Sequence, residues 1–83
     1  MKLNLGSGGK HMYGFINVDG RADTKPDVVC DLKDIASKFQ SVDLIYASHV
    51  LEHFPFAKNS YYPTTCYDLL LNWYTALKTG GIL

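Results

Sequence analysis

Four short apolar runs, each closed by a glycine, an acid or a serine, most constrain what this chain can fold into. They span residues 2–5, 15–18, 27–30 and 43–47, and the residues that close them are Gly6, Asp19, Asp31 and Ser48. Runs of this length that are rich in Val, Ile, Leu and Tyr are typical of buried strands. Ligands of open parallel α/β sheets bind at the carboxyl ends of the strands, so the closing residues are candidate ligand contacts.

One longer segment has the spacing of an amphipathic helix. Its expected apolar face consists of Leu70, Trp73, Tyr74 and Leu77. Thr65 and Asp68 have the spacing of a capping box at its start. Lys78 is expected near the negative end of the helix, and Gly80 is expected to end it in a left-handed conformation. Residues 82–83 then begin what we expect to be a fifth strand.

The connections between the first three expected strands are short. They consist of residues 6–14 and 19–26, whereas a parallel crossover usually needs about 10–12 residues including its helix. We therefore expect single turns or irregular loops in these two connections. Shorter helical segments are expected after Asp34 and after Ser48.

Composition and charge exclude several classes of protein. A chain of 83 residues forms at most one small domain. Its 8 Lys and Arg balance its 8 Asp and Glu, so it has no basic stripe for nucleic acid. No apolar run is long enough to cross a membrane. Cys30 and Cys66 lie in apolar contexts, so we expect free thiols in a reducing compartment and a cytoplasmic location.

The glycine-rich segment after the first run favours a nucleoside ligand over a nucleotide phosphate. Gly6-Ser7-Gly8-Gly9 follows an expected strand, so its backbone can approach a ligand closely. It does not match a P-loop, because His11 stands where Ser or Thr belongs and Asn4 replaces the first glycine. It also lacks the third glycine of the dinucleotide fingerprint, which would be at position 11. A tight turn without a ligand would give the same pattern.

Two acids close neighbouring runs, and each has a functional and a structural interpretation. Asp19 could accept hydrogen bonds from ribose hydroxyls, or it could belong to an Asp-Gly turn. Asp31 could accept from an adenine amino group, or it could cap the segment that begins near Lys33.

The segment His49-Val50-Leu51-Glu52-His53 matches the inverted zincin pattern H-x-x-E-H. Two histidines at i and i+4 share one helix face, as zinc ligation requires. However, Glu52 is the only glutamate in the chain, so a downstream glutamate ligand is missing. We therefore expect no metal, and interpret these residues as the lining or support of a pocket.

Taken in order, these segments resemble the N-terminal part of a class I S-adenosylmethionine (SAM)-dependent methyltransferase. The resemblance is closest to small methyltransferases associated with polysaccharide biosynthesis. It rests on the glycine-rich segment, the two acids, the stretch 41–53 and the stretch 76–81. It implies a three-layer, Rossmann-like α/β fold with a parallel sheet, SAM as cofactor, and methyl transfer to a small-molecule or sugar-type acceptor.

The resemblance also implies roles for individual residues. The residues expected to bind the cofactor are Asn4, Gly6, Ser7, Gly8, Asp19, Asp31, Leu32, Ser48 and His49, and His53 is the candidate general base. Asn4 stands where the family usually has an acid that contacts the amino acid portion of SAM; it can hydrogen-bond the ammonium but supplies no charge. Two alternatives remain open: a SAM-binding fragment without activity, and a nicotinamide-binding Rossmann domain.

The resemblance further implies that the sheet is cut short at the start of its fifth strand. We then expect residues 43–47 to form an exposed edge, with part of the apolar helix face uncovered. Such surfaces predict self-association, most simply as a two-fold dimer.

Overall fold

The computed structural model describes residues 1–48, 50, 54 and 64–82. The strands are β1 (Lys2–Leu5), β2 (Ile16–Asp19), β3 (Val28–Val29), β4 (Val42–Ala47) and β5 (Leu77–Ile82). The helices are the 3-10 turns η1 (Ala22–Thr24) and η2 (Leu32–Asp34), and the α-helices α1 (Ile35–Lys38) and α2 (Cys66–Ala76). Each of the four apolar runs therefore forms a strand, shifted by one residue or shortened in places.

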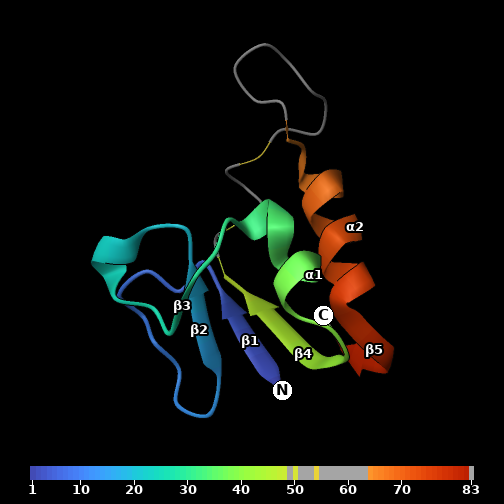
Figure 1. The fold of residues 1–83 in the computed structure, drawn as a ribbon, viewed down its shortest axis with the longest axis horizontal. Helices are drawn as coiled ribbons and strands as arrows, with labels where there is room; N and C mark the ends of the chain where they lie inside the picture. The colour runs from blue at the N-terminus through green and yellow to red at the C-terminus, as the bar shows by residue number, and fades with distance from the viewer. Residues whose placement is uncertain (49, 51–53, 55–63, 83) are drawn as a thin grey trace.

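The five strands form one sheet in the order β3-β2-β1-β4-β5, and every neighbouring pair is parallel (Figure 1). The chain moves from β1 outward to β2 and β3, then returns to the other side of β1 for β4 and β5. The expected parallel α/β sheet is confirmed, and the strand order is consistent with a Rossmann-like fold. The reversal places a topological switch point between β1 and β4.

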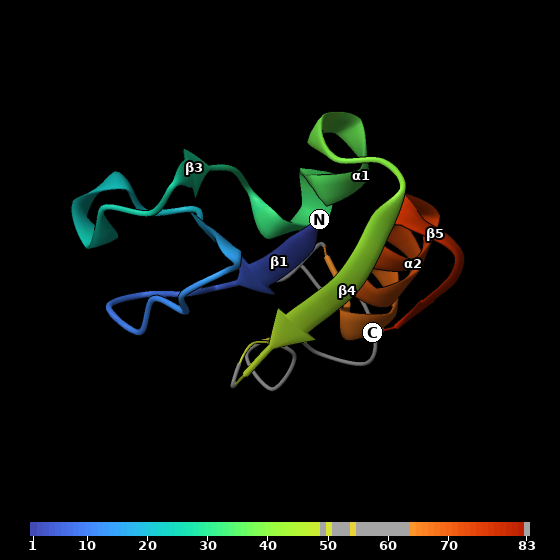
Figure 2. The ribbon, with the colours of Figure 1, turned by 90° about the horizontal axis from the view of Figure 1, so that it is seen from below.

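Both α-helices of the described residues lie at one face of the sheet. Helices α1 and α2 pack against each other, and η2 packs against α2 (Figures 1 and 2). The connections from β1 to β2 and from β2 to β3 hold no α-helix, as their short lengths predicted. Among the described residues, the fold thus has two layers of regular structure, not the three that we expected.

The core lies between the sheet and the two helices. Its largest fully buried side chains are Trp73, Leu3, Leu5, Ile35, Ile45, Leu69, Val18 and Val42. The Trp73 indole N–H donates to the Leu32 carbonyl oxygen at 2.8 Å, which satisfies its polar atom inside the core. This hydrogen bond connects α2 to η2.

The expected apolar face of α2 was partly wrong. The residues that this helix buries are Cys66, Leu69, Trp73 and Ala76, whereas Tyr74 is 72% exposed. Periodicity alone allows several rotations of a helix rich in Leu and Tyr, and packing against α1 and η2 selects the one that buries Trp73. The capping box is confirmed: Thr65 Oγ1 accepts from the Asp68 N–H, and an Asp68 carboxylate oxygen accepts from the Thr65 N–H.

The C-terminal end of the expected helix was also wrong. Helix α2 ends at Ala76, so Lys78 and Gly80 belong to β5 and not to a helix end. Strand β5 begins five residues earlier than expected and pairs with β4 at Val42–Leu77 and Leu44–Ile82, with a register shift between. Strand β5 therefore covers the edge of β4 as far as Leu44, so the exposed edge expected at residues 43–47 is wrong for its first part.

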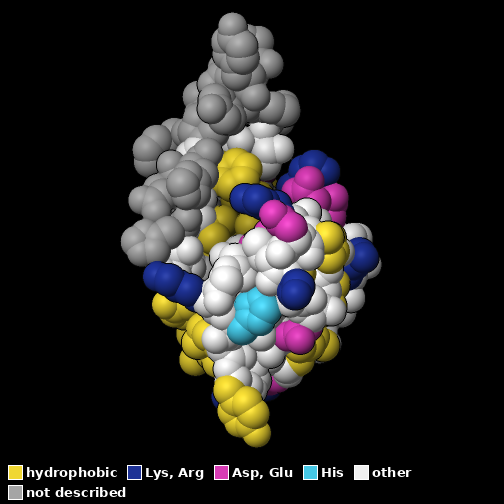
Figure 3. Space-filling model, turned by 90° about the vertical axis from the view of Figure 1, so that its left-hand side faces the viewer, with side chains coloured by type: hydrophobic (Ala, Val, Ile, Leu, Met, Phe, Trp, Pro, Cys, Tyr) yellow, Lys and Arg dark blue, Asp and Glu magenta, His cyan; other side chains and the backbone are white. Residues whose placement is uncertain are grey.

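Both cysteines, Cys30 and Cys66, are free and buried, as expected. Burial raises the pKa of the Cys30 thiol above its ordinary value. No helix among the described residues is long and apolar enough to cross a membrane. On the face drawn in Figure 3, Lys and Arg side chains alternate with Asp and Glu, without a patch of one sign.

Candidate functional site

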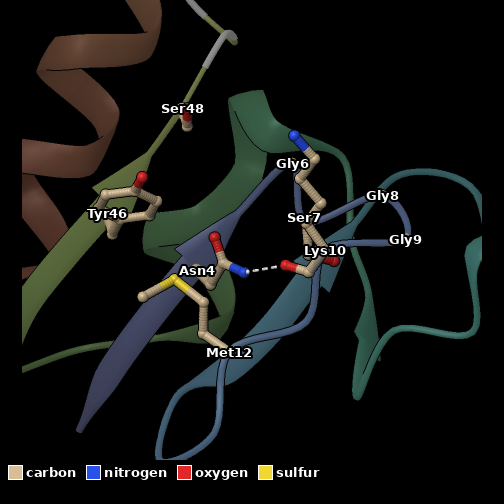
Figure 4. Close-up of a pocket in the computed structure, with 9 residues that line it drawn as sticks. All are labelled: Asn4, Gly6, Ser7, Gly8, Gly9, Lys10, Met12, Tyr46 and Ser48. Carbon is tan, nitrogen blue, oxygen red and sulfur yellow. Dashed lines mark hydrogen bonds between the residues drawn. The ribbon is translucent and has the colours of Figure 1, made fainter.

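A cavity of about 460 Å³ opens at the carboxyl ends of β1 and β4. Its described lining consists of Asn4, Gly6, Ser7, Gly8, Gly9, Lys10, Met12, Tyr46 and Ser48 (Figure 4). These residues come from β1, the turn that follows it, and the end of β4. The cavity therefore lies at the topological switch point, where open α/β sheets bind their ligands, and its volume suits a small organic ligand.

The glycines of the turn after β1 have different roles. Gly6 has a φ of +65°, and a Cβ atom added to it would lie 2.6 Å from Val50 Cγ2. The protein's own core thus occupies the space beside Gly6. Gly8 has a φ of +51° with open space around the position of a Cβ atom. Only a backbone that accepts left-handed conformations forms this turn without strain. Gly8 and Gly9, which both have open space around the position of a Cβ atom, leave room for a ligand.

Ser7 carries a buried hydroxyl group without a hydrogen-bond partner. Its side chain is 5% exposed, and its Oγ atom makes no hydrogen bond within the described part of the chain. A buried polar group without a partner is costly in a folded protein. Because Ser7 lines the cavity, a ligand there could complete its hydrogen bonding.

Asn4 presents a fixed hydrogen-bond acceptor to the same cavity. Its Nδ2 atom donates to the Lys10 carbonyl oxygen at 3.1 Å and to Asn17 Oδ1 at 2.9 Å. Both hydrogens of the amide are therefore used, and the amide orientation follows from these acceptors. Figure 4 shows the amide oxygen on the side away from the Lys10 carbonyl, toward the cavity.

Asn17 and Asp27 hold Asn4 in this orientation. Asn17 Oδ1 also accepts from the Met12 N–H at 2.8 Å, and Asn17 Nδ2 donates to Asp27 Oδ2 at 3.0 Å. The same Asp27 oxygen accepts from the Asn17 N–H at 2.7 Å. These hydrogen bonds from Asn17 lower the pKa of the Asp27 carboxyl group below its ordinary value. Asn4 donates to Asn17, and Asn17 donates to the Asp27 carboxylate, which can only accept. The orientation of both amide groups is therefore determined.

The structure places Asp19 and Asp31 outside the described cavity lining. Asp19 Oδ2 accepts from the Gly8 N–H at 2.7 Å, and Oδ1 accepts from the Arg21 N–H at 2.9 Å. Asp19 thus fixes the glycine turn, although its remaining lone pairs can still accept from a ligand. Asp31 caps η2 by accepting from the Lys33 N–H at 3.1 Å, which is the structural interpretation offered by the sequence. Leu32 packs near Gly6 and contributes to the core.

Besides Gly9 of the glycine-rich segment, three lining residues were not predicted from the sequence. Lys10, Met12 and Tyr46 all contribute to the cavity, and Tyr46 is 46% exposed on β4. The alternation of side chains along β4 could have indicated Tyr46, because it shares a sheet face with its neighbour Asn4 in the parallel register. Lys10 and Met12 lie in an irregular connection, where the sequence has no periodic signal.

Two predicted site residues, His49 and His53, lie outside the described residues, and so does most of the H-x-x-E-H segment. The described residues contain no group of three or more His, Cys, Asp or Glu that could hold a metal ion.

Comparison with known proteins found no match: no family model, curated protein or solved structure is significantly similar to this chain.

Proposed function

We propose that this chain binds SAM at the switch-point cavity and belongs to a methyltransferase that acts on a small-molecule acceptor. The observation that carries the proposal is the position of the cavity, between the ends of β1 and β4 and directly above a glycine turn. In open α/β sheets this position is the binding site of nucleoside cofactors. The sequence resemblance to class I methyltransferases leads independently to the same ligand.

The lining fits the chemistry of SAM. Tyr46 and Met12 provide aromatic and apolar surface, as small-molecule sites require. Asn4 and Ser7 add polar groups that have hydrogen-bonding capacity left. Asp19 holds the Gly8 N–H and so keeps the turn open beside the cavity. When bound, SAM supplies an electrophilic methyl group on a sulfonium.

The chain's own contribution to methyl transfer is positional. A rigid site that holds donor and acceptor in line can lower the barrier by several kcal/mol, on the order of the orientation effect seen in intramolecular reactions. The rigidity here comes from the Asn4 hydrogen bonds and from Gly6, which packs against Val50. His53 remains our candidate for the group that accepts the proton of the acceptor.

Calorimetric titration with S-adenosylhomocysteine, the demethylated product, tests the proposal. We expect saturable binding with a 1:1 stoichiometry, and no binding of NADH under the same conditions. Absence of heat with millimolar S-adenosylhomocysteine would contradict the proposal, and preferential binding of NADH would favour a nicotinamide-binding domain instead. Incubation with labelled SAM and candidate sugar acceptors would then separate an active methyltransferase from an inactive SAM-binding fragment.

A further inference from the structure

The cavity lining contains both a hydrogen-bond acceptor, the Asn4 amide oxygen, and a cation, the Lys10 ammonium. Among its described lining residues, Lys10 is the one charged side chain. Figure 4 shows this side chain extending along the glycine turn past Ser7, with its ammonium near Gly6. The Lys10 ammonium forms no ion pair with any carboxylate in the described part of the chain, whereas Lys33 and Lys78 both do.

Hydrogen bonds hold the backbone of Lys10 beside the cavity. The Lys10 N–H donates to the Ser7 carbonyl oxygen at 2.8 Å, and the Lys10 carbonyl oxygen accepts from Asn4. Residue 10 is therefore fixed at both of its backbone polar groups, beside the Ser7 hydroxyl and the Asn4 amide. The side chain itself is exposed.

We propose that Lys10 is a specificity-determining residue, whose ammonium binds the carboxylate of a zwitterionic amino-acid group that Asn4 and Ser7 bind beside it. Asn4 Oδ1 accepts from the ligand's ammonium, and the Ser7 hydroxyl, which has no partner in the described chain, donates to its carboxylate. An acceptor and a cation that line the same cavity match a group that carries both charges. This inference rests on the proposed function, because SAM and its product carry such a group.

Two ligands that differ only in the carboxylate test this role. Wild-type protein is expected to bind S-adenosylhomocysteine about three- to tenfold more tightly than its decarboxylated analogue, as one partly exposed charge pair allows. Lys10→Met should abolish this preference, and Lys10→Arg should restore it. Lys38→Met, a change of an exposed lysine on α1 away from the cavity, should leave the preference unchanged. Higher ionic strength should reduce the preference in the wild type, in Lys10→Arg and in Lys38→Met, and should have no effect on the ratio of the two affinities in Lys10→Met.

The outcomes separate this inference from the function on which it rests. If the wild type binds both ligands equally well, or if Lys10→Met weakens both by the same factor, Lys10 does not bind the carboxylate, although the chain still binds the nucleoside. If adenosine diphosphate binds more tightly than S-adenosylhomocysteine and depends on Lys10, the lysine is a phosphate ligand and the inference is wrong. If no adenosyl ligand binds, the proposed function and this inference both fail.

Discussion

At the scale of single residues, the buried Ser7 hydroxyl offers the cleanest separation of binding from stability. Its Oγ atom makes no hydrogen bond within the described chain, so Ser7→Ala removes no bond from the free protein. We expect the free energy of unfolding to change by less than about 0.5 kcal/mol, while affinity for S-adenosylhomocysteine falls about fivefold.

Ser37→Ala is the matched control for Ser7→Ala. Ser37 is exposed on α1, and its hydroxyl donates to the Asp34 carbonyl oxygen. Calorimetry and chemical denaturation should show that this variant has wild-type affinity. Equal affinity of the Ser7→Ala variant and the wild type would mean that the hydroxyl does not contact the ligand.

The three glycines of the turn after β1 form a graded series. Gly9→Ala meets open space and no left-handed strain, so we expect little change in stability. Gly8→Ala meets open space at φ +51° and should cost about 1 kcal/mol. Gly6→Ala adds a clash with Val50 to its φ of +65° and should cost more than about 2 kcal/mol. Denaturation curves that rank the three variants in another order would contradict this geometry.

At the scale of elements, the start of α2 depends on two reciprocal hydrogen bonds. Thr65→Ala removes the side-chain acceptor of the Asp68 N–H and should lower the free energy of unfolding by about 1 kcal/mol. Thr75→Ala, in the last turn of the same helix, is the control. Its hydroxyl donates to the Leu71 carbonyl oxygen in an exposed position, so urea denaturation should show a change of less than about 0.5 kcal/mol.

The pairing of β5 with β4 has a signature in the titration of Asp43. Hydrogen bonds and charge attraction from Lys78 on β5 and from the N-terminal ammonium of Met1 lower the pKa of the Asp43 carboxyl group to about 2. A depressed carboxyl pKa stabilises the fold above the ordinary value of 3.8, and this stabilisation is lost as the pH falls toward 2. Nuclear magnetic resonance titration of the wild type should therefore show a pKa of about 2 for Asp43.

Lys78→Met tests the β5 contact directly. We expect this variant to raise the Asp43 pKa toward 3.8, because the hydrogen bond and the positive charge of Lys78 are the main causes of the lowered pKa and both are lost. Lys33→Met removes a lysine that pairs with Asp31 and Asp34, and it should leave the Asp43 titration unchanged. An Asp43 pKa that does not respond to Lys78→Met would show that β5 does not hold this position in solution.

At the scale of the whole molecule, we still predict self-association, but through the exposed side of α2 in place of the β4 edge. Strand β4 pairs with β5 at Val42 and Leu44, so this part of its edge provides no template for another chain. Instead, α2 exposes Tyr67, Leu71 and Tyr74 by 61%, 68% and 72%, at a spacing of i, i+4 and i+7. Exposed apolar stripes of this kind favour association in water.

Light scattering over a range of concentrations measures this association. We expect the apparent mass to rise with concentration, and Leu71→Lys to suppress the rise without unfolding the chain. Ser37→Lys, on the exposed side of α1, should have no such effect. A constant mass of 9.3 kDa at high micromolar concentration would contradict the prediction.

The sequence alone determined the features that depend on neighbours along the chain. The apolar runs predicted four strands because each run is short and is closed by a residue that ends a buried strand. Thr65 and Asp68 predicted the capping box because its two hydrogen bonds join residues three apart. The short connections predicted crossovers without α-helices between β1, β2 and β3. The glycine-rich segment likewise predicted ligand contacts at Gly6, Ser7 and Gly8, and these residues line the cavity.

Tertiary structure decided the rest, because the responsible contacts join residues distant in the sequence. The buried face of α2 follows from packing on α1 and from the hydrogen bond between Trp73 and Leu32. Strand β5 follows from pairing with β4, which a Gly-Gly segment does not signal on its own. Asp19 became a support of the Gly8 turn, and Asn4 became an oriented acceptor only because Asn17 and Asp27 meet it across the sheet. Local pattern fixes where strands and caps form, whereas the direction of a buried amide depends on partners that only the folded chain brings together.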